Sequence, residues 1–390
     1  MSDIVILGCG ISGALTALTL AQNNIRCKVI EIKSENSLLE SDDPRTTALN
    51  ASSKNFFEQI NIWDALTPYI QEIRDIFVCQ NMSDDILHLA NERESLGFMI
   101  PNDIFRNILY KQVQQNPNID IITESAYSEM IHLENKVSIT ITTRGKKTKI
   151  DASLCIVADG KFSNARKDIF DSRIEKNYNQ KAIVFNIAHT KNHEAGAIEH
   201  FLPRGTFATL PLVGGFNSGI VWVEEESIAD FYTSKDDNFL CDTISRFIGG
   251  ALGEIKIISK PVSFPLNASL TKKYYNKRLV LIADSAHTIH PLAGQGLNVG
   301  IKDVESLCGL IVKHNSLGLE YDESMLEKYQ SDRKSDNAKM VHITDTINRV
   351  FTTKYSIINK ITQKGLSILD KSDILKKTLI SYAKGNRVSK

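Results

Sequence analysis

The sequence has few of the features that mark disulfide-stabilised, metal-binding or membrane-spanning proteins. Its six cysteines are scattered and no two form a CxxC pair, which argues against a zinc site or a disulfide framework and favours reduced, buried thiols in the cytoplasm. No apolar run approaches the roughly 20 residues that a membrane-spanning helix needs. The most apolar stretch, 4–21, contains three glycines and has no basic segment before it. It therefore does not fit a signal peptide.

The chain also lacks a net charge. Its 46 basic and 46 acidic residues balance, which argues against a nucleic-acid-binding surface spread over the whole molecule. The distribution is uneven, because the segment from Lys354 onwards carries nine basic and two acidic residues, a charge of +7. This end of the chain has a broken helical periodicity. Its lysines fit either the solvated face of helices packed on the body or electrostatic attachment to an anionic membrane.

Length and composition predict a folded globular protein with more than one domain. Hydrophobic residues make up 42% of the chain and charged residues 24%, which is ordinary for a soluble protein. The 390 residues exceed what one hydrophobic core usually organises. We therefore expect two intertwined domains and a C-terminal appendage.

The amino-terminal region carries a dinucleotide-binding pattern in its full context. An apolar strand at 4–7 leads into GxGxxG at 8–13, then a small-residue helix, then a strand at 27–30 that ends at Glu31. In this pattern the first glycine makes the turn, the second admits a pyrophosphate and the third lets the helix pack on the strand. The acid accepts a hydrogen bond from a ribose hydroxyl. The predicted contacts are Gly8, Gly10, Ile11, Ser12, Gly13 and Glu31.

A second glycine-rich segment, 278–303, follows the same logic near the other end of the chain. An apolar run at 279–283 predicts a buried parallel strand, with Asp284 at its carboxyl end. A turn through Pro291 then leads to Gly294, Gly296 and a helical pattern. Such an edge binds ligands in open α/β sheets, and the helix start suits a ligand that gains negative charge. Taken alone, the segment fits equally well a turn in which the acid caps the backbone.

Further signals lie between these two segments. A third apolar strand, 154–158, ends in Asp159 and Gly160, so three such strands end in Gly or Asp at the same kind of edge. Arg45 lies in a polar loop, and a guanidinium suits a pyrophosphate, although a solvated arginine fits that loop as well. From 178 to 263 the pattern changes to alternating strands separated by turn residues. This stretch predicts an inserted, largely antiparallel sheet, and a further strand is predicted at 255–264. Earlier in the chain, strands at 137–142 and 148–150 flank a basic turn and predict a hairpin.

Together these segments resemble the flavoprotein aromatic hydroxylases, the single-component FAD monooxygenases of the para-hydroxybenzoate hydroxylase type. Among these, the chain looks most like the ubiquinone-biosynthesis hydroxylases. The matching segments cover nearly the whole chain: 8–13, 43–49, 155–166, 201–212 and 284–303. The sequence departs from the family pattern at Ala283, where glycine is usual, and at Ser285, where alanine is usual.

The resemblance implies an α/β fold with two domains and a C-terminal segment. The expected Rossmann-like FAD-binding domain has three layers around a mostly parallel sheet and comprises 1–75, 99–175 and 270–340. A largely antiparallel substrate-binding domain comprises 76–98 and 176–269, and a basic helical segment comprises 341–390.

The resemblance also assigns roles to single residues. Asp284 is implied to bind the ribityl chain of FAD, Asp159 to serve both FAD and NADPH, and Arg45 and Arg106 to make polar contacts to the cofactor. The turn and helix start are implied to approach the flavin ring through Pro291, Gly294, Gln295, Gly296, Leu297 and Asn298. No residue is nominated as a catalytic base.

The implied reaction uses NADPH or NADH to reduce FAD. Oxygen adds to the reduced flavin, and the flavin hydroperoxide hydroxylates the aromatic ring of a polyprenylated ubiquinone precursor. The family binds the nicotinamide transiently, which fits the lack of a second GxGxxG. His287 and His290, spaced HxxH, have no indicated carboxylate or cysteine partner, so we expect no metal there. A related FAD isoprenoid reductase and a flavin-binding scaffold of a quinone-biosynthesis complex are the alternatives. The expected location is the cytoplasm, with peripheral attachment at the inner face of the membrane as the alternative for the basic segment.

Overall fold

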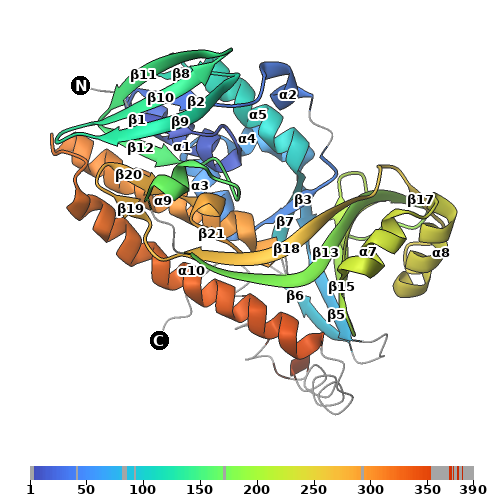
Figure 1. The fold of residues 1–390 in the computed structure, drawn as a ribbon. Helices are drawn as coiled ribbons and strands as arrows, with labels where there is room; N and C mark the ends of the chain where they lie inside the picture. Colours follow the sequence, from blue (N-terminus) through green and yellow to red (C-terminus); the bar gives the residue numbers. More distant parts are fainter. Residues whose placement is uncertain are drawn as a thin grey trace.

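The computed structural model describes residues 4–40, 43–80, 86–91, 94–169, 173–290 and 294–352, and in addition residues 369, 370, 372, 376 and 380. Figure 1 shows a body built on a parallel sheet and a second sheet beside it, linked by two long strands. This mixed α/β architecture confirms the predicted fold class.

The parallel sheet brings together strands from distant parts of the sequence. Its order is β19-β20-β12-β1-β2-β8, and only the edge strand β19 is antiparallel to its neighbour. The strands are β1 (Ile4–Leu7), β2 (Cys27–Ile30), β8 (Ile119–Ile122), β12 (Leu154–Val157), β19 (Tyr275–Asn276) and β20 (Leu279–Leu281). Every residue of β1, β12 and β20 is buried, as expected for apolar runs covered on both faces. The three strands predicted to end at one edge are therefore confirmed as parallel neighbours.

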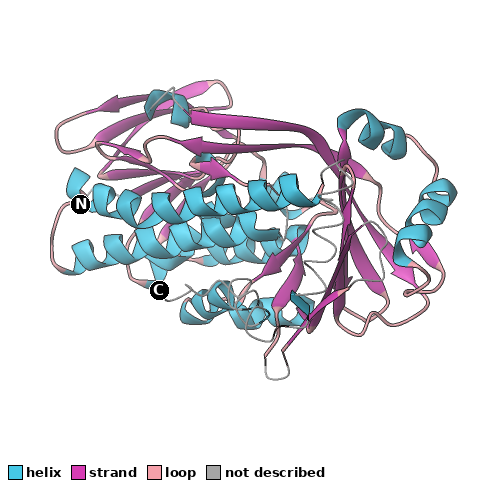
Figure 2. Ribbon diagram, turned by 90° about the horizontal axis from the view of Figure 1, so that it is seen from below, coloured by secondary structure: helices cyan, strands magenta, loops and turns pink. Residues whose placement is uncertain are grey.

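Two layers cover the parallel sheet. One contains α1 (Ile11–Gln22), α5 (Asn102–Gln115) and α9 (Gln295–Ser316), and α1 packs against both of the others. The other is an antiparallel sheet of β9 (Ser125–His132), β10 (Val137–Thr143) and β11 (Lys146–Ala152). The β10–β11 pair confirms the predicted hairpin, whose turn residues Arg144 and Gly145 both have positive φ. Figure 2 shows long helices side by side under the strands.

The second sheet is largely antiparallel, as predicted, and has nine strands. Its order is β21-β18-β13-β16-β15-β14-β5-β6, with β17 beside β13. The strands are β5 (Asp75–Gln80), β6 (Leu87–Ala90), β13 (Arg173–His189), β14 (Gly196–Leu202), β15 (Gly205–Leu212), β16 (Asn217–Glu225), β17 (Ile255–Ile257), β18 (Val262–Thr271) and β21 (His287–Thr288).

The prediction of one strand in this sheet was wrong. The run 255–264 was predicted as a single strand, but it divides into β17 and β18 around Pro261. Proline cannot donate to a strand ladder, so the chain bends there and pairs with β13 at two separate places. Strand β13 also starts earlier than expected, at Arg173, and forms with β18 the long link visible in Figure 1.

The two faces of the second sheet have different neighbours. The outer face packs under α7 (Glu226–Thr233) and α8 (Asp237–Ile248) around a core that includes Phe207 and Trp222. We call the opposite face the inner face. Because side chains alternate along strands, it carries the small apolar residues between those core positions, Ala182, Val184, Ala208, Val221 and Val223. The three-stranded sheet β3 (Thr46–Leu49), β7 (Gly97–Pro101) and β4 (Gln71–Ile73) packs against β15.

Helix α10 (Glu323–Phe351) connects the two sheets. Near its start the Tyr329 hydroxyl donates to Leu281 O at 3.1 Å, in the parallel sheet. At its end Phe351 stacks on Phe201 of β14, with ring centroids 4.4 Å apart. The helix runs without interruption through 340–341, the predicted start of the C-terminal segment. The domain boundaries themselves stay a prediction.

The remaining elements are short. They are α2 (Glu35–Leu39), α3 (Ala51–Gln59), α4 (Trp63–Leu66), α6 (Ala165–Ile169), and 3₁₀ turns at Thr67–Tyr69 and Ala283–Ser285. All six cysteines are free thiols, and five of them are buried, as predicted. No helix in the described ranges is long and apolar enough to cross a membrane. Most of the predicted terminal helices, from residue 353 onwards, lie outside the described residues.

Candidate functional site

The three glycines of the amino-terminal motif have three different surroundings. Gly8 has φ +98°, and a Cβ there would lie 2.6 Å from Ala158 O. A Cβ on Gly13 would lie 2.0 Å from Gly8 O. At Gly10, by contrast, no described atom would come within 4 Å of a Cβ, and no described side chain caps the start of α1. The first and third glycines are thus required by packing, and the middle one faces open space beside unbonded helix amides.

Glu31 closes the loop that these glycines form. Its carboxylate is buried, accepting a hydrogen bond from Cys9 N at 2.7 Å and another from Lys33 N at 2.9 Å. The predicted acid therefore holds the glycine loop against the end of β2. Each carboxylate oxygen retains a further lone pair, since an ionised carboxylate has about four acceptor sites.

Arg45 and Arg106, predicted separately, meet at one carboxylate that the sequence reasoning gave no role. Asp43 accepts two hydrogen bonds from the Arg45 side chain, at 2.8 and 2.7 Å, and one from Arg45 N at 3.1 Å, and its Oδ2 lies 3.2 Å from Arg106 Nη2. Burial acts to raise the pKa of Asp43, but the bonds and charge of Arg45 outweigh it and hold that pKa below its usual value. The Arg45 guanidinium also lies over the Phe264 ring of β18, 5.0 Å from its centroid. Both arginines are thereby held at Asp43, and Arg45 also contacts the second sheet.

The carboxyl ends of the central strands lie at one level. Leu7 pairs with Val157, and Val157 pairs with Leu281. The backbone continues this alignment, because Ala158 N donates to Leu7 O and Ile282 N donates to Val157 O. Gly8, Asp159 and Asp284 therefore follow neighbouring strands at the same edge. In an open α/β sheet this edge is where ligands bind.

Asp159 and Asp284 lie at this edge, and we call the region formed by the start of α1, these two carboxylates and the start of α9 the recess. Both side chains are exposed to solvent, yet burial among surrounding protein atoms is the largest influence on both carboxyls and raises their pKa. On a convex surface an exposed carboxylate has few protein atoms around it, and bulk water solvates it. A carboxylate on the wall of a hollow can be exposed to solvent and still have many protein atoms around it. Arg45 and Lys161 act in the opposite direction on Asp284 and favour its charged form.

The start of α9 forms another side of this region. Gly294 has φ +61° and lies against Ala48, while a Cβ on Gly296 would meet no described atom within 4 Å. Gln295 and Leu297 are partly exposed, and Pro291 lies outside the described residues. The opening beside Gly296 resembles the one beside Gly10, so two uncapped helix starts have room in front of them.

The Asn298 side chain has a structural task at this point. Its Oδ1 accepts hydrogen bonds from Asn50 N at 3.0 Å and Ser53 Oγ at 2.8 Å, and its Nδ2 donates to Ala48 O at 2.8 Å. The side chain is buried and ties α9 to the start of α3. Because the side chain is bonded within the protein, the backbone of Asn298 is the part that remains for a ligand. The predicted contact of Asn298 with the cofactor stays a prediction.

The two departures from the family pattern have local explanations. Ala283 has φ +50°, a conformation that glycine adopts more easily. Its methyl group would lie 2.8 Å from a Cβ on Gly300, so the glycine of α9 makes room for it. Ser285 is buried, and its hydroxyl lies 2.7 Å from Val157 O, bridging the ends of β20 and β12.

A buried polar network, which the sequence analysis did not find, holds the backbone next to Asp284. Asp303, in α9, accepts hydrogen bonds from Ala283 N at 3.0 Å and His287 Nε2 at 2.5 Å, and its other oxygen accepts from Arg333 Nε at 2.8 Å. Burial opposes its ionisation, but His287 and Arg333 outweigh it and lower the pKa of Asp303 to about 2. An acid among the apolar positions of α9 was the available signal. The network clamps the backbone next to Asp284 to two helices.

The histidines of the HxxH pair have other contacts. His287 bonds to Asp303, and His290 meets Tyr178 edge-on with ring centroids 4.8 Å apart. Within the described ranges, no group of three His, Cys, Asp or Glu side chains could hold a metal ion.

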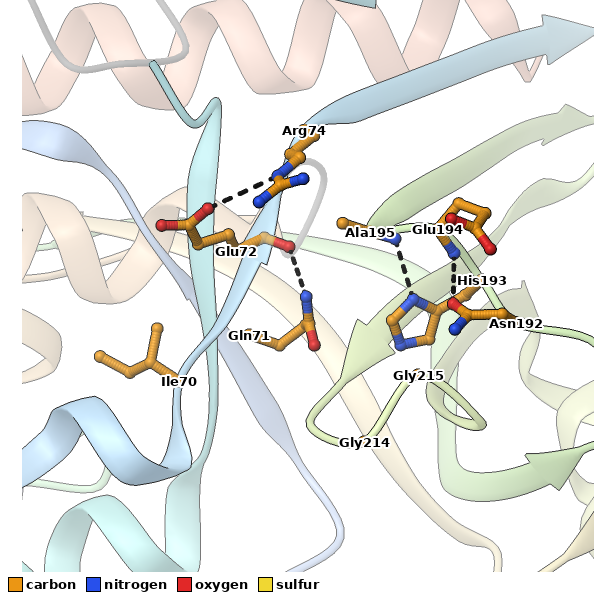
Figure 3. A pocket seen from close by; sticks show the side chains of 10 residues that line it. All are labelled: Ile70, Gln71, Glu72, Arg74, Asn192, His193, Glu194, Ala195, Gly214 and Gly215. Carbon is orange, nitrogen blue, oxygen red and sulfur yellow. Dashed lines mark hydrogen bonds and ion pairs between the residues drawn. The ribbon is translucent and has the colours of Figure 1, made fainter. Parts of the chain in front are cut away.

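A cavity lies elsewhere in the part of the chain that the structure describes. It has a volume of about 610 Å³ and opens between β4 and the loops at the far end of the second sheet (Figure 3). Its lining consists of Ile70, Gln71, Glu72, Arg74, Asn192, His193, Glu194, Ala195, Gly214 and Gly215. None of these is a predicted site residue. We favour the recess at Asp284, because open glycines, helix starts and enclosed carboxylates converge there.

Comparison with known proteins identifies the family. A family model described as an FAD binding domain matches residues 1–344. The chain belongs to the FAD binding domain family. The recess fits FAD, because it offers space beside Gly10 for a pyrophosphate, a helix start beside Gly296, and accessible carboxylates between them.

Two named bacterial proteins match over almost the whole chain. The chain is 28% identical to the ubiquinone hydroxylase UbiL of Rhodospirillum rubrum, over 99% of this chain and 90% of the relative. It is 25% identical to the 3-demethoxyubiquinol 3-hydroxylase of Escherichia coli, over 98% of each chain. Among solved structures, p-nitrophenol 4-monooxygenase from Pseudomonas putida matches with a TM-score of 0.81, covering 100% of this chain and 99% of that one at 15% identity. This last likeness shows the shared fold.

Proposed function

We propose that this member of the FAD binding domain family is an FAD- and NAD(P)H-dependent monooxygenase that hydroxylates the aromatic ring of a polyprenylated ubiquinone precursor. The recess at the ends of β1, β12 and β20 carries the proposal, because it combines the two open helix starts with two enclosed carboxylates. The full-length similarity to proteins named as ubiquinone hydroxylases supports the choice of substrate.

The cofactor would lie along the recess from Glu31 to α9. The amides of Ile11 and Ser12, beside Gly10, would receive the pyrophosphate, with Gly8 and Gly13 holding the turn. Glu31 would accept from the adenosine ribose, and Arg45 and Arg106 would add positive charge. Asp284 would accept from the ribityl hydroxyls, and the flavin ring would face Gly294–Asn298. Asp159 would contact both FAD and the nicotinamide cofactor.

FAD, when bound, takes electrons from NAD(P)H and activates oxygen for transfer to the ring. The protein supplies position, charge and exclusion of water. The amino end of α9 gives positive potential where the cofactor gains negative charge. The Asp303 network fixes the backbone at Ala283 and Asp284. The apolar inner face of the second sheet offers a dry wall for an aromatic ring and its isoprenyl chain.

The test uses the purified, FAD-loaded protein with NADPH, isotope-labelled oxygen and a phenol carrying a short isoprenyl chain. We expect one labelled oxygen atom in the product. Reduction of the isoprenyl chain without oxygen would instead identify an isoprenoid reductase. Failure of NADPH to bleach the bound FAD, with substrate present, would identify a flavin-binding scaffold. Complementation of hosts that each lack one ring hydroxylase then identifies the ring position.

We further propose that the basic C-terminal segment attaches the protein to the membrane that holds such substrates. Its charge of +7 from Lys354 onwards supports this, since polybasic segments bind anionic lipid surfaces. Deleting 354–390 should weaken binding to phosphatidylserine vesicles in a salt-sensitive way. Unchanged vesicle binding would contradict it. The alternative for this segment is the solvated face of helices packed on the body. A complex with other quinone-biosynthesis enzymes is a separate proposal, which a pull-down of the whole protein with those enzymes in the absence of lipid tests.

A further inference from the structure

One carboxylate lies in the middle of the apolar inner face. Glu199 belongs to β14, and the residues two positions away on its strand, Ala197 and Phe201, are apolar and buried. Its cross-strand partners are Val78 on β5 and Ala208 on β15. Partners in register share a face of the sheet. The four nearest positions around Glu199 on that face therefore all carry apolar side chains.

Few described groups stabilise the negative charge of Glu199 in these apolar surroundings. Within the described residues it forms no salt bridge, and the side-chain hydrogen bond that favours its charge comes from Thr206. Burial outweighs that bond and raises the pKa of Glu199 to about 7. The residue nevertheless keeps partly exposed surface, so a ligand can reach it. An unpaired carboxylate in apolar surroundings is costly, and such groups concentrate at functional sites.

Contacts connect this face to the region proposed for the flavin ring. Val78 and Ala197, the neighbours of Glu199, pack in one apolar cluster with Ala48 of β3. Ala48 in turn lies against Gly294, 3.4 Å from the position of a Cβ there, and its carbonyl accepts from Asn298. The neighbours of Glu199 and the start of α9 thus both contact a single apolar cluster.

We propose that Glu199 contacts the substrate and accepts a hydrogen bond from a hydroxyl group on its aromatic ring. A phenol is apolar except for this donor, and the four positions nearest to Glu199 on the inner face are apolar. Binding would give the carboxylate a second hydrogen-bond partner besides Thr206 and would fix the rotation of the ring. The inference rests on the proposed function, because it takes the substrate to be a prenylated phenol.

The experiment measures binding without turnover. The FAD-loaded protein is titrated, in the absence of NADPH, with a phenol bearing a short isoprenyl chain and separately with its methyl ether. The absorption spectrum of FAD reports the dissociation constant of each. The wild type should bind the phenol about tenfold or more tightly than the ether, since a hydrogen bond to a charged group has that value. Glu199→Gln should lose most of this preference, and Glu199→Asp should keep part of it.

Glu224→Gln is the matched control. Glu224 is a buried carboxylate of β16 in the same sheet, with a pKa also raised by burial. It is next to Val223 of the inner face, so it points to the outer face, where it interacts with Trp222. The control variant should retain the preference for the phenol.

A pH series gives a second signature. Because the ionised carboxylate is the better acceptor, wild-type affinity for the phenol should rise as pH increases through about 7, and affinity for the ether should stay constant. Among the described groups, Cys79 is coupled electrostatically to Glu199, and burial raises its pKa to about 11. The neighbouring His200 points to the other face, and its pKa is lowered by burial. Neither gains charge over this range. The nearby inner-face positions of β15 and of α10, Thr206 and Phe351, do not titrate.

Equal binding of phenol and ether by the wild type would overturn the inference, and so would an unchanged preference in Glu199→Gln. If Glu199→Gln does not fold or load FAD, the wild-type comparison of the two ligands across pH still decides. Failure of the wild type to hydroxylate any prenylated phenol would refute the proposed function. A wild type that hydroxylates the phenol while Glu199→Gln keeps the full preference would refute only the role of Glu199.

Discussion

The packing of Ala283 against Gly300 predicts a strong coupling between these two positions. Ala283 has positive φ, and its methyl group would lie 2.8 Å from a Cβ added to Gly300. The next atoms around that Cβ lie at 3.5 Å, an ordinary contact distance. A methyl group at one position is therefore tolerated, and methyl groups at both are not.

The expected energies follow from these contacts. Gly300→Ala gains about 1 kcal/mol of helix propensity inside α9, but the clash costs about 1–3 kcal/mol. Ala283→Gly relieves about 1–2 kcal/mol of backbone strain, offset by about 0.4–1 kcal/mol of unfolded-chain entropy and about 0.8 kcal/mol of lost methyl burial. The double variant retains the propensity gain without the clash. The coupling free energy should therefore be about 1–3 kcal/mol in favour of the pair.

The assay is urea unfolding of the FAD-free proteins, followed by tryptophan fluorescence, so that cofactor binding does not contribute. Gly309→Ala is the control, because Gly309 is on the same helix and no described atom would contact its Cβ within 4 Å. It should gain about 1 kcal/mol in either background. Additivity of Ala283→Gly and Gly300→Ala within about 0.5 kcal/mol would refute the reasoning.

Three further predictions concern the recess and its support. Asp284→Ala should lose FAD while the fold survives; a purified variant that still holds stoichiometric flavin would exclude Asp284 as the anchor. Gly10→Ala should fold but bind FAD more weakly. Gly13→Ala should not fold, because its Cβ would collide with Gly8 O. Circular dichroism and flavin content separate the two results. Asp303→Asn should destabilise the protein by about 3–5 kcal/mol, because it removes the buried carboxylate 2.8 Å from Arg333 and leaves that buried guanidinium with only the more distant and more exposed Asp336 at 3.5 Å among the described ion pairs. In the wild type, the folded pKa of Asp303, about 2, lies below the unfolded value of about 3.9. The stabilisation that ionised Asp303 gives the folded state is therefore present above about pH 4 and lost as pH falls through about 2. The urea midpoint, measured across this pH range, should fall with pH. A midpoint that does not fall would contradict the ion pairing.

Sequence periodicity predicted the parts of the fold that depend on local patterns. The strands 4–7 and 27–30 have the predicted bounds, because continuous apolar runs next to glycines leave few alternatives. The recess was also predictable, since three strands end in glycine or acid and parallel strands share an edge. The interruption of the strand at Pro261 could have been predicted from the proline, but the apolar residues on both sides favoured a continuous strand.

Other features depend on packing that no local pattern records. The partners of Asp303 are 16 and 30 residues away, so the network exists only after α9 and α10 pack together. The family resemblance implied that Asn298 contacts the cofactor, and it could not show that the Asn298 side chain bonds to Ala48 and Ser53. Alternation could place Glu199 on a face of β14, but it could not say that every neighbour there would be apolar.

The order of strands in the parallel sheet has a consequence for how the protein is made. β1 lies between β2 and β12, and β20 pairs on the far side of β12. The glycine loop after β1 leaves the ribosome first, but Ala158, which packs against Gly8, follows about 150 residues later. Ala283 and the start of α9 come later still. Contacts so distant in sequence form slowly, so the cofactor site is among the last features to be completed. Shortened chains that end before β20 should accumulate as species with an unpaired β12 edge, prone to aggregation, and FAD supplied during synthesis should help only the full-length product.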